Sequence, residues 1–356
     1  TRCGDDSLTV MKEIVRLPKL EKGDRVAILS PSFAAPGRFP HVYELGLKRL
    51  REIFELEPIE FPATKKIGAT GEERAADLVA AFENPSIKGI ISSIGGNDQV
   101  TYIKNLPSEP FTQNPKPFFG YSDNTHFANF LWMHDVPSFY GGALFTQFAM
   151  EGKIDDFTLK YLKLALFESG ERELEASPVY SDIGLDWNDP SNLEKLETFL
   201  PNNGWQWDGT ENAEGISWGG CLESIDELLR HNIVIPSLLD FENVILCTET
   251  SEEMPSADYV FRVYRALGER GILARVRGIL VGRPKSWEFG NEHDDAWQVA
   301  HRIEQRETIL KVVRAYNPTV PVIQNLDFGH TNPQIPLPYG GHIRIDSGTR
   351  KIFATF

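Results

Sequence analysis

Apolar residues are arranged in two distinct patterns along the first 150 residues. Short apolar runs bounded by turn-forming residues predict buried strands, and apolar residues that recur every three or four positions predict amphipathic helices. The predicted strands are 25–30, 87–94 and 117–120, and the predicted helices are 41–54, 70–82 and 125–134. Because strands and helices follow one another in turn, the pattern predicts a parallel sheet with flanking helices.

Residues 181–215 interrupt this pattern, because they are rich in Asn, Asp, Pro, Gly and Trp and lack clear periodicity. Short apolar runs return after them. The further predicted strands are 243–247, 276–281, 320–323 and 342–345, and the further predicted helices are 257–270 and 294–315. We therefore expect an α/β protein with an N-terminal domain at 12–180, a connection at 181–215 and a C-terminal domain at 216–356.

Charge and cysteine content narrow the classes of partner. The formal net charge is −15, from 51 acidic and 36 basic residues, which argues against nucleic acid or an anionic membrane as the main partner. The three cysteines, Cys3, Cys221 and Cys247, show no metal-binding or disulfide spacing. No apolar run is long enough to span a bilayer, and the first ten residues lack the apolar core of a signal peptide. We expect a cytoplasmic protein without a metal or cofactor.

A candidate nucleophile follows the strand at 117–120. Ser122 lies in Gly-Tyr-Ser-Asp, between that strand and the helix at 125–134. A serine at such a junction is exposed at the sheet edge and lies near free helix amides, as in a nucleophile elbow. The alternative is that Ser122 or Asp123 only caps the helix.

Two glycines follow the strand at 87–94. Gly95 and Gly96 allow the backbone to approach a ligand closely. The amides of Gly96 and of Asp123 are candidates for the two halves of an oxyanion hole. The alternative is an ordinary turn at the end of a strand.

A serine nucleophile needs a base, and the base needs an acid that orients it. His330 lies in a loop between Gly329 and Pro333, and His126 is a rival because it is close to Ser122 in the sequence. Glu249 ends an apolar strand and is the candidate acid. We expect the following Glu252 and Glu253 to cap or begin the next helix.

Taken together, these motifs resemble the LD-carboxypeptidase family of serine peptidases (peptidase family S66). The likeness extends over 22–345. It comprises S-P-S at 30–32, S-I-G-G at 93–96, G-Y-S-D at 120–123, F-Y-G-G-A at 139–143, G-G-C-L at 219–222, E-T-S-E at 249–252 and G-H-T-N-P at 329–333. The resemblance implies a flavodoxin-like N-terminal domain, a swivelling β/β/α C-terminal domain and a homodimer. It also implies a Ser122–His330–Glu249 triad, with oxyanion groups on Gly96 and Asp123.

Within the family, the S-I-G-G form and Trp187 resemble the branch of microcin C immunity proteins, in which a tryptophan stacks on a nucleotide base. The resemblance implies that Gly95, Asn97 and Trp187 contact substrate. Alternatively, Trp187 packs a loop against the body, together with Trp205 and Trp207. Cys221 stands where the family usually has Asn.

Three functions are therefore weighed. The first is a serine amidase that cleaves peptidyl- or aminoacyl-nucleotides, as in inactivation of a microcin C-like toxin. The second is an LD-carboxypeptidase that releases D-alanine from murein tetrapeptides, and the third is a non-catalytic small-molecule binding protein. Arg262, Arg283 and Lys285 are available to bind a substrate anion, and the sequence does not choose among them.

Overall fold

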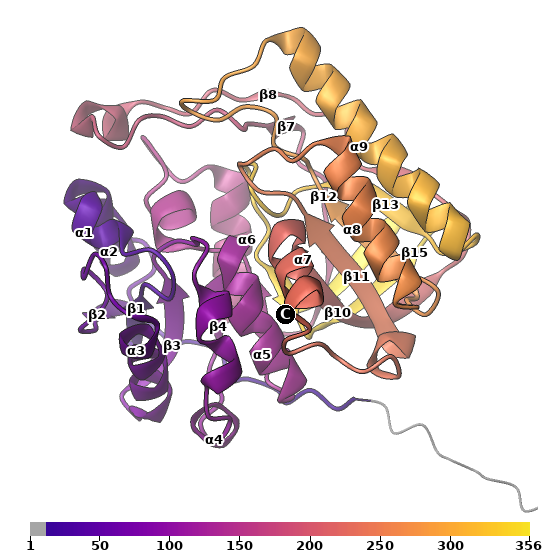
Figure 1. Cartoon of the computed structure of the whole chain (residues 1–356). Coiled ribbons are helices and arrows are strands. Elements are labelled where there is room, and N and C mark those ends of the chain that lie inside the picture. The colour runs from indigo at the N-terminus through magenta and orange to yellow at the C-terminus, as the bar shows by residue number, and fades with distance from the viewer. Residues whose placement is uncertain (1–11) are drawn as a thin grey trace, which may run out of the picture.

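The computed structural model describes residues 12–356, so Cys3 lies outside the described part. These residues form an α/β structure with two large sheets. In Figure 1 the N-terminal half (indigo to magenta) lies beside the C-terminal half (orange to yellow), and α5 and α7 lie where the halves meet. The predicted two-domain α/β architecture is confirmed.

The first sheet has six strands in the order β14-β5-β4-β3-β1-β2. Five of them are parallel, and their order is that of a flavodoxin-like sheet. The strands are β1 (Arg25–Leu29), β2 (Glu57–Glu60), β3 (Ile87–Ser92), β4 (Phe118–Gly120), β5 (Ser138–Tyr140) and β14 (Leu337–Tyr339), of which β14 is antiparallel to β5. The loops after β1, β3 and β4 therefore meet at one edge, where such folds bind ligands.

The helices of this half lie close to the predicted segments. Thr70 caps α3 because its hydroxyl accepts a hydrogen bond from the amide of Glu73, whose carboxylate accepts one from the Thr70 amide. The helices are α1 (Ala35–Arg38), α2 (Pro40–Glu52), α3 (Gly71–Glu83), α4 (Glu109–Gln113), α5 (Thr125–Met133) and α6 (Asp156–Phe167).

The second sheet has eight strands in the order β6-β16-β15-β10-β11-β12-β13-β9. Its central strands β10 to β13 are parallel, and the outer strands are antiparallel to their neighbours. The strands are β6 (Glu171–Leu174), β9 (Gln206–Asp208), β10 (Ala213–Cys221), β11 (Val244–Glu249), β12 (Gly278–Gly282), β13 (Val322–Leu326), β15 (His342–Asp346) and β16 (Lys351–Thr355). A separate pair joins β7 (Val179–Tyr180) to β8 (Leu200–Pro201).

The helices of the second half are α7 (Leu222–His231), α8 (Ala257–Glu269) and α9 (Asp295–Tyr316). Figure 1 shows α8 and α9 side by side against the second sheet. Within residues 12–356, no helix combines the length and the apolar character needed to cross a bilayer.

The two sheets exchange edge strands. β6 precedes residue 180 but pairs in the second sheet, and β14 follows residue 216 but pairs in the first. The connection at 181–215 is also not entirely irregular, because it supplies β9 at the edge of the second sheet. The domain limits at 180/181 and 215/216 stay a prediction.

A shared apolar core joins the two halves. Trp218 of β10 is buried, and its indole N–H donates to the Asn129 side chain of α5 at 2.8 Å. Gly220 has φ 114°, and a Cβ there would overlap Thr125 of α5. Such close packing fixes the second sheet against the helix that follows Ser122.

Arg49 of α2 is a buried cation that ties the helix to the chain after η4 (Leu144–Phe148). Its guanidinium donates to the carbonyls of Phe148, Met150 and Gly152 at 3.0, 2.5 and 2.9 Å. Arg49→Met leaves these carbonyls without a donor, so we expect a loss of roughly 2–4 kcal/mol in the free energy of unfolding, measured by urea denaturation. The exposed Arg51→Met is the control and should cost less than about 0.5 kcal/mol; equal losses would contradict this role.

Candidate active site

Ser122 occupies a strained turn between β4 and α5. Its φ of 65° lies in the left-handed region, which costs a residue with a side chain roughly 1–2 kcal/mol. Its amide donates to the Tyr140 hydroxyl at 3.1 Å, and its carbonyl accepts from the Thr125 hydroxyl at 2.7 Å. Neither Ser122 nor Asp123 caps the helix with its side chain, so the capping alternative is wrong. The geometry is that of a nucleophile elbow.

His330 and Glu249 form a buried pair. Glu249 ends β11 with its side chain fully buried, and one carboxylate oxygen accepts from His330 Nδ1 at 2.7 Å and from the His330 amide at 3.2 Å. Gly329 has φ 97°, and a Cβ there would overlap the Glu249 carboxylate. The glycine before the histidine is therefore required for this contact, which fixes the imidazole ring in one orientation.

Tyr140 links this pair to Ser122, and the sequence analysis missed it. Its hydroxyl donates to the other oxygen of Glu249 at 2.6 Å and accepts from the Ser122 amide. Burial, together with the charge of Glu249, raises the pKa of the Tyr140 phenol well above its ordinary value. The phenol therefore stays protonated and remains a donor to the carboxylate.

Gly95 and Gly96 lie directly against Ser122. A Cβ on Gly95 would come within 2.7 Å of Ser122 Cβ and 2.9 Å of Ser122 Oγ, and within 3.4 Å of the Asp123 amide nitrogen. Gly96 has φ 149°, and a Cβ there would meet Ser32 at 2.6 Å. The space beside Ser122 therefore depends on two residues without side chains, and the Asp123 amide faces that space.

The Asp123 carboxylate holds three loops together at the carboxyl edge of the first sheet. It accepts from the Ser32 hydroxyl after β1, and from the amides of Asp98 and Gln99 after β3 at 2.9 and 3.0 Å. Burial works in the opposite direction, but hydrogen bonds, first of all from His126, lower the pKa of Asp123. This network gives Ser32 of the S-P-S segment a structural role and fixes the glycine loop beside Ser122.

A cavity of about 620 Å³ opens over these groups. Trp187 forms part of its wall and packs edge-on against Phe39 and Phe145, with ring centroids 5.6 and 5.4 Å apart. Trp205 and Trp207 pack against the core away from the cavity. The predicted site residues that line the cavity are Gly95, Gly96, Asn97, Ser122, Trp187 and His330, while Glu249 lies behind His330.

Comparisons with known proteins agree with this arrangement. The family model described as the LD-carboxypeptidase N-terminal domain matches residues 26–141, and the model described as the C-terminal domain matches 214–345. A putative carboxypeptidase of Treponema pallidum is 30% identical over 78% of this chain and 75% of that protein. This chain belongs to the LD-carboxypeptidase family. It is therefore a serine hydrolase with a carboxypeptidase- or MccF-type activity.

Two further proteins are similar to this chain over almost its whole length. The microcin C7 self-immunity protein MccF of Escherichia coli is 25% identical over 94% of both chains. The structure of an MccF-like protein from Streptococcus pneumoniae in complex with AMP has a TM-score of 0.81 and 26% identity, and covers 93% of this chain and 98% of that one. Both sheets of the hydrolase therefore have counterparts in a solved two-domain structure.

His126, the alternative candidate for the base, forms ion pairs with two other carboxylates. It is fully buried on α5, and its Nε2 lies 3.2 Å from Asp123 and 3.0 Å from Glu227. Burial works the other way, but the two carboxylates raise the pKa of His126 to about 9. The ligand atoms of these three residues lie within 4.8 Å of one another, because both carboxylates contact the same imidazole nitrogen. His126 thus supports Asp123 and does not compete with His330.

His330 has a second carboxylate partner. Its Nε2 lies 3.1 Å from Glu252, whose side chain is about half exposed. The expectation that Glu252 and Glu253 begin the next helix is wrong, because α8 begins at Ala257 and is capped by Ser256. Among the described residues, Ser122 and His330 share no hydrogen bond, and the imidazole nitrogen that is not bonded to Glu249 faces Glu252.

Cys221 is a buried thiol and not a second nucleophile. Its Sγ donates to Glu223 at 3.3 Å. Burial, with the charges of Glu223 and Glu249, raises the pKa of the Cys221 thiol well above its ordinary value. A thiol in this state lacks the thiolate that nucleophilic attack requires.

Of the three candidate cations, Arg262, Arg283 and Lys285, Lys285 lines the cavity and the other two do not. Lys285 pairs with Glu288 at 2.7 Å. Although burial works the other way, Glu288 raises the pKa of Lys285, so its charge persists at neutral pH. Arg283 is buried against Asp327 at 2.5 Å, and Arg262 is exposed on α8.

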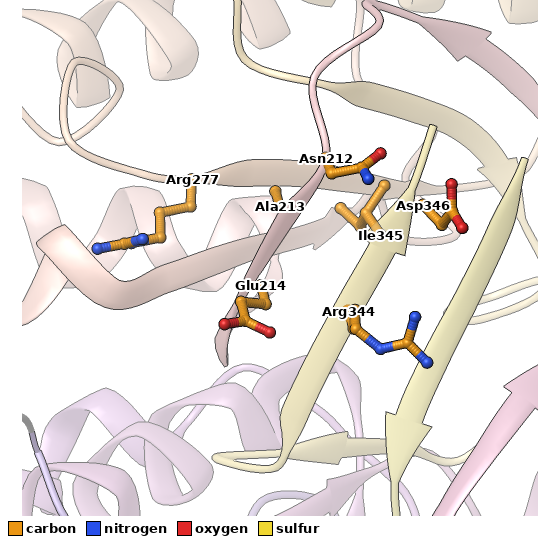
Figure 2. Close-up of a pocket in the computed structure, with 7 residues that line it drawn as sticks. All are labelled: Asn212, Ala213, Glu214, Arg277, Arg344, Ile345 and Asp346. Atoms are coloured by element: carbon orange, nitrogen blue, oxygen red, sulfur yellow. The ribbon is translucent and has the colours of Figure 1, made fainter. Parts of the chain in front are cut away.

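A separate hollow of about 500 Å³ lies over the second sheet, and the seven residues in Figure 2 line it. Figure 2 shows Glu214 between the side chains of Arg277 and Arg344. Arg344 pairs with Glu171 at 2.8 Å. The hollow contains none of the predicted site residues.

The Tyr140 hydroxyl should matter for turnover more than for binding. Tyr140→Phe removes the donor to Glu249 and the acceptor for the Ser122 amide, so we expect kcat to fall about 10–100-fold with little change in KM. Tyr161→Phe is a matched control, because the Tyr161 hydroxyl accepts a partly buried backbone hydrogen bond from Glu175 away from the site. Steady-state kinetics of both variants, with thermal melts to check folding, test this role. A Tyr140 variant as active as the control would refute it.

Proposed function

We propose that the chain is a serine amidase that cleaves the amide bond joining an aminoacyl or peptidyl group to a nucleotide, with Ser122, His330 and Glu249 as its triad. The observation that carries the proposal is the strained Ser122 turn, bonded through the Tyr140 hydroxyl to the same buried carboxylate that holds His330. One network thus joins the candidate nucleophile to the candidate base.

The chemistry is acyl transfer. His330 Nε2 takes the proton of Ser122 as Oγ attacks the carbonyl carbon, and the amides of Gly96 and Asp123 stabilise the oxyanion. His330 then protonates the leaving nitrogen, and the C–N bond breaks to give an acyl-enzyme. Water, deprotonated by His330, releases the acid and restores the serine. Glu249 stabilises the imidazolium formed in both halves.

The cavity supports a nucleotide as the leaving group. Trp187 offers an aromatic wall for a base, and Lys285 offers a positive charge for a phosphate or sulfamate. The similar protein from Streptococcus pneumoniae was solved with AMP, and the similar protein from Escherichia coli is named for self-immunity to microcin C7. We infer a nucleotide-linked toxin as the substrate class, with Gly95 and Asn97 along the substrate path.

A second candidate is an LD-carboxypeptidase acting on murein tetrapeptides. It is favoured by the name of a Bacillus subtilis relative, a probable murein peptide carboxypeptidase, which is 23% identical over 93% of this chain. The non-catalytic alternative is set aside by membership of a hydrolase family. The homodimer and the cytoplasmic location stay predictions.

Hydrolysis of an aminoacyl sulfamoyl adenosine tests the proposed reaction directly. We expect the wild-type protein to release the amino acid, and Ser122→Ala or His330→Ala to lower kcat about 10³-fold or more while both variants stay folded, because each removes a group that acts on the reacting bond. Chromatography of the products is the measurement. Release of D-alanine from a murein tetrapeptide, with no cleavage of the nucleotide substrate, would favour the second candidate instead.

Binding of AMP tests the nucleotide subsite without any turnover. Trp187→Ala should weaken the Kd about tenfold or more, since stacking of a base on an aromatic ring contributes roughly 1–3 kcal/mol. Trp297→Ala on α9 removes a partly exposed indole that does not line the cavity and serves as the control. Isothermal titration calorimetry distinguishes the two. An unchanged Kd in the Trp187 variant would put the base elsewhere.

A further inference from the structure

Both imidazole nitrogens of His330 contact carboxylates. Nδ1 is bonded to Glu249, and Nε2 lies 3.1 Å from Glu252. The first contact orients the base. The second occupies the nitrogen that must accept the Ser122 proton, so catalysis requires that Glu252 move away from it.

Glu252 is free to move in a way that Glu249 is not. About half of its side chain is exposed, and it belongs to the short loop between β11 and α8. Burial opposes the effect, but the pairing with His330 lowers the pKa of Glu252 to about 2. At neutral pH the carboxylate is therefore charged, and a competing cation is needed to draw it from the imidazole.

A second, smaller cavity shows where such a cation would come from. It has a volume of about 380 Å³ and shares Ser122, Gly96, Asn97, Glu252 and Glu253 with the main cavity. Because Ser122 lines both cavities, a substrate whose nucleotide lay in the main cavity would place its acyl group in this second space. Its charged lining is mostly acidic, comprising Asp123, Glu223, Asp226, Glu227, Glu252, Glu253 and Arg230.

The single cation in that lining is already paired. Arg230 bonds to Asp226 on the same helix, and Glu227 is engaged by His126. The space beside the acyl side of Ser122 thus has an excess of negative charge, with the Glu252 carboxylate at its boundary with the base. Such a space favours an acyl group that carries a positive charge and disfavours an anionic one.

We propose that the substrate carries a free ammonium group on the carbon next to its scissile carbonyl, and that Glu252 is the specificity residue that receives it, leaving His330 for Ser122 as it does so. The proposal rests on the proposed function and deepens it, because it selects aminoacyl over N-blocked peptidyl substrates. An α-ammonium is two bonds from the carbonyl carbon that Ser122 attacks, and so lies close to the nitrogen that Glu252 contacts.

A pair of isosteric substrates tests this. Alanyl sulfamoyl adenosine carries the ammonium, and its lactyl analogue has a hydroxyl in the same position. We expect the wild-type kcat/KM to be about tenfold or more higher for the alanyl compound, as for a charge-assisted hydrogen bond. In Glu252→Gln we expect the preference for the alanyl compound to disappear, because alanyl cleavage slows while lactyl cleavage persists. Asp258→Asn, an exposed charge removed in the first turn of α8, is the control and should keep the preference.

The pH profile gives a second readout that a merely structural role would not move. His330 is faced by Glu249 from β11, Glu252 from the next loop and the Tyr121 ring after β4, with Lys285 near Glu252. Burial disfavours the imidazolium, yet the two carboxylates raise the pKa of His330 well above its ordinary value. With the lactyl substrate, kcat/KM should rise with pH as His330 loses its proton, and Glu252→Gln should move that rise to lower pH.

Equal wild-type rates on the two substrates, or a preference that survives in Glu252→Gln, would overturn the inference while leaving the amidase intact. An unshifted pH profile in that variant would overturn it as well. If neither substrate is cleaved faster than by Ser122→Ala, the proposed function fails and this inference fails with it.

Discussion

The buried carboxylate of Glu249 is the constraint on which the site depends. One of its oxygens accepts a hydrogen bond from Tyr140 of the first sheet, and the other is bonded to His330 in the loop after β13. A charge with its side chain fully buried is tolerated only when its lone pairs are bonded, and removing one partner of a buried pair typically costs about 3–5 kcal/mol. The carboxylate therefore selects one mutual position of the two sheets, the position that brings His330 beside the Ser122 turn.

Close packing between the two halves holds the two sheets in this mutual position. One apolar cluster extends through both sheets, and β10 lies so close to α5 that Gly220 has no room for a side chain. On the other side of Ser122, the Asp123 carboxylate draws the loops after β1 and β3 together. The site is thus preorganised except at Glu252, whose half-exposed side chain contacts His330 from a position that solvent and substrate can reach.

Much of this arrangement could be predicted from the sequence, because it depends on local signals. Gly95 and Ser122 follow short apolar strands of the first sheet and Glu249 ends one of the second, and parallel strands carry such positions to one edge of each sheet. The capping box of α3 is equally local. Membership of the family was also visible in short motifs distributed along the chain.

The rest depends on contacts between distant parts of the chain. Tyr140 lies in the F-Y-G-G-A motif, but that motif does not show that its hydroxyl reaches Glu249, which is 109 residues away. Glu252 was assigned to a helix because acidic residues favour helix starts, whereas Ser256 supplies the actual cap. The exchange of β6 and β14 between the sheets is a matter of edge pairing, which the hydrophobic pattern does not specify.

The most direct test of the central claim is the rate at which a fluorophosphonate acylates the protein, followed by intact mass and peptide mapping. If the Glu249–His330 pair activates Ser122, a single adduct forms on Ser122, and Glu249→Gln slows its formation by about a hundredfold or more. An adduct on another residue, or labelling of Ser122 at the same rate in the wild-type protein and in Glu249→Gln, would contradict the account.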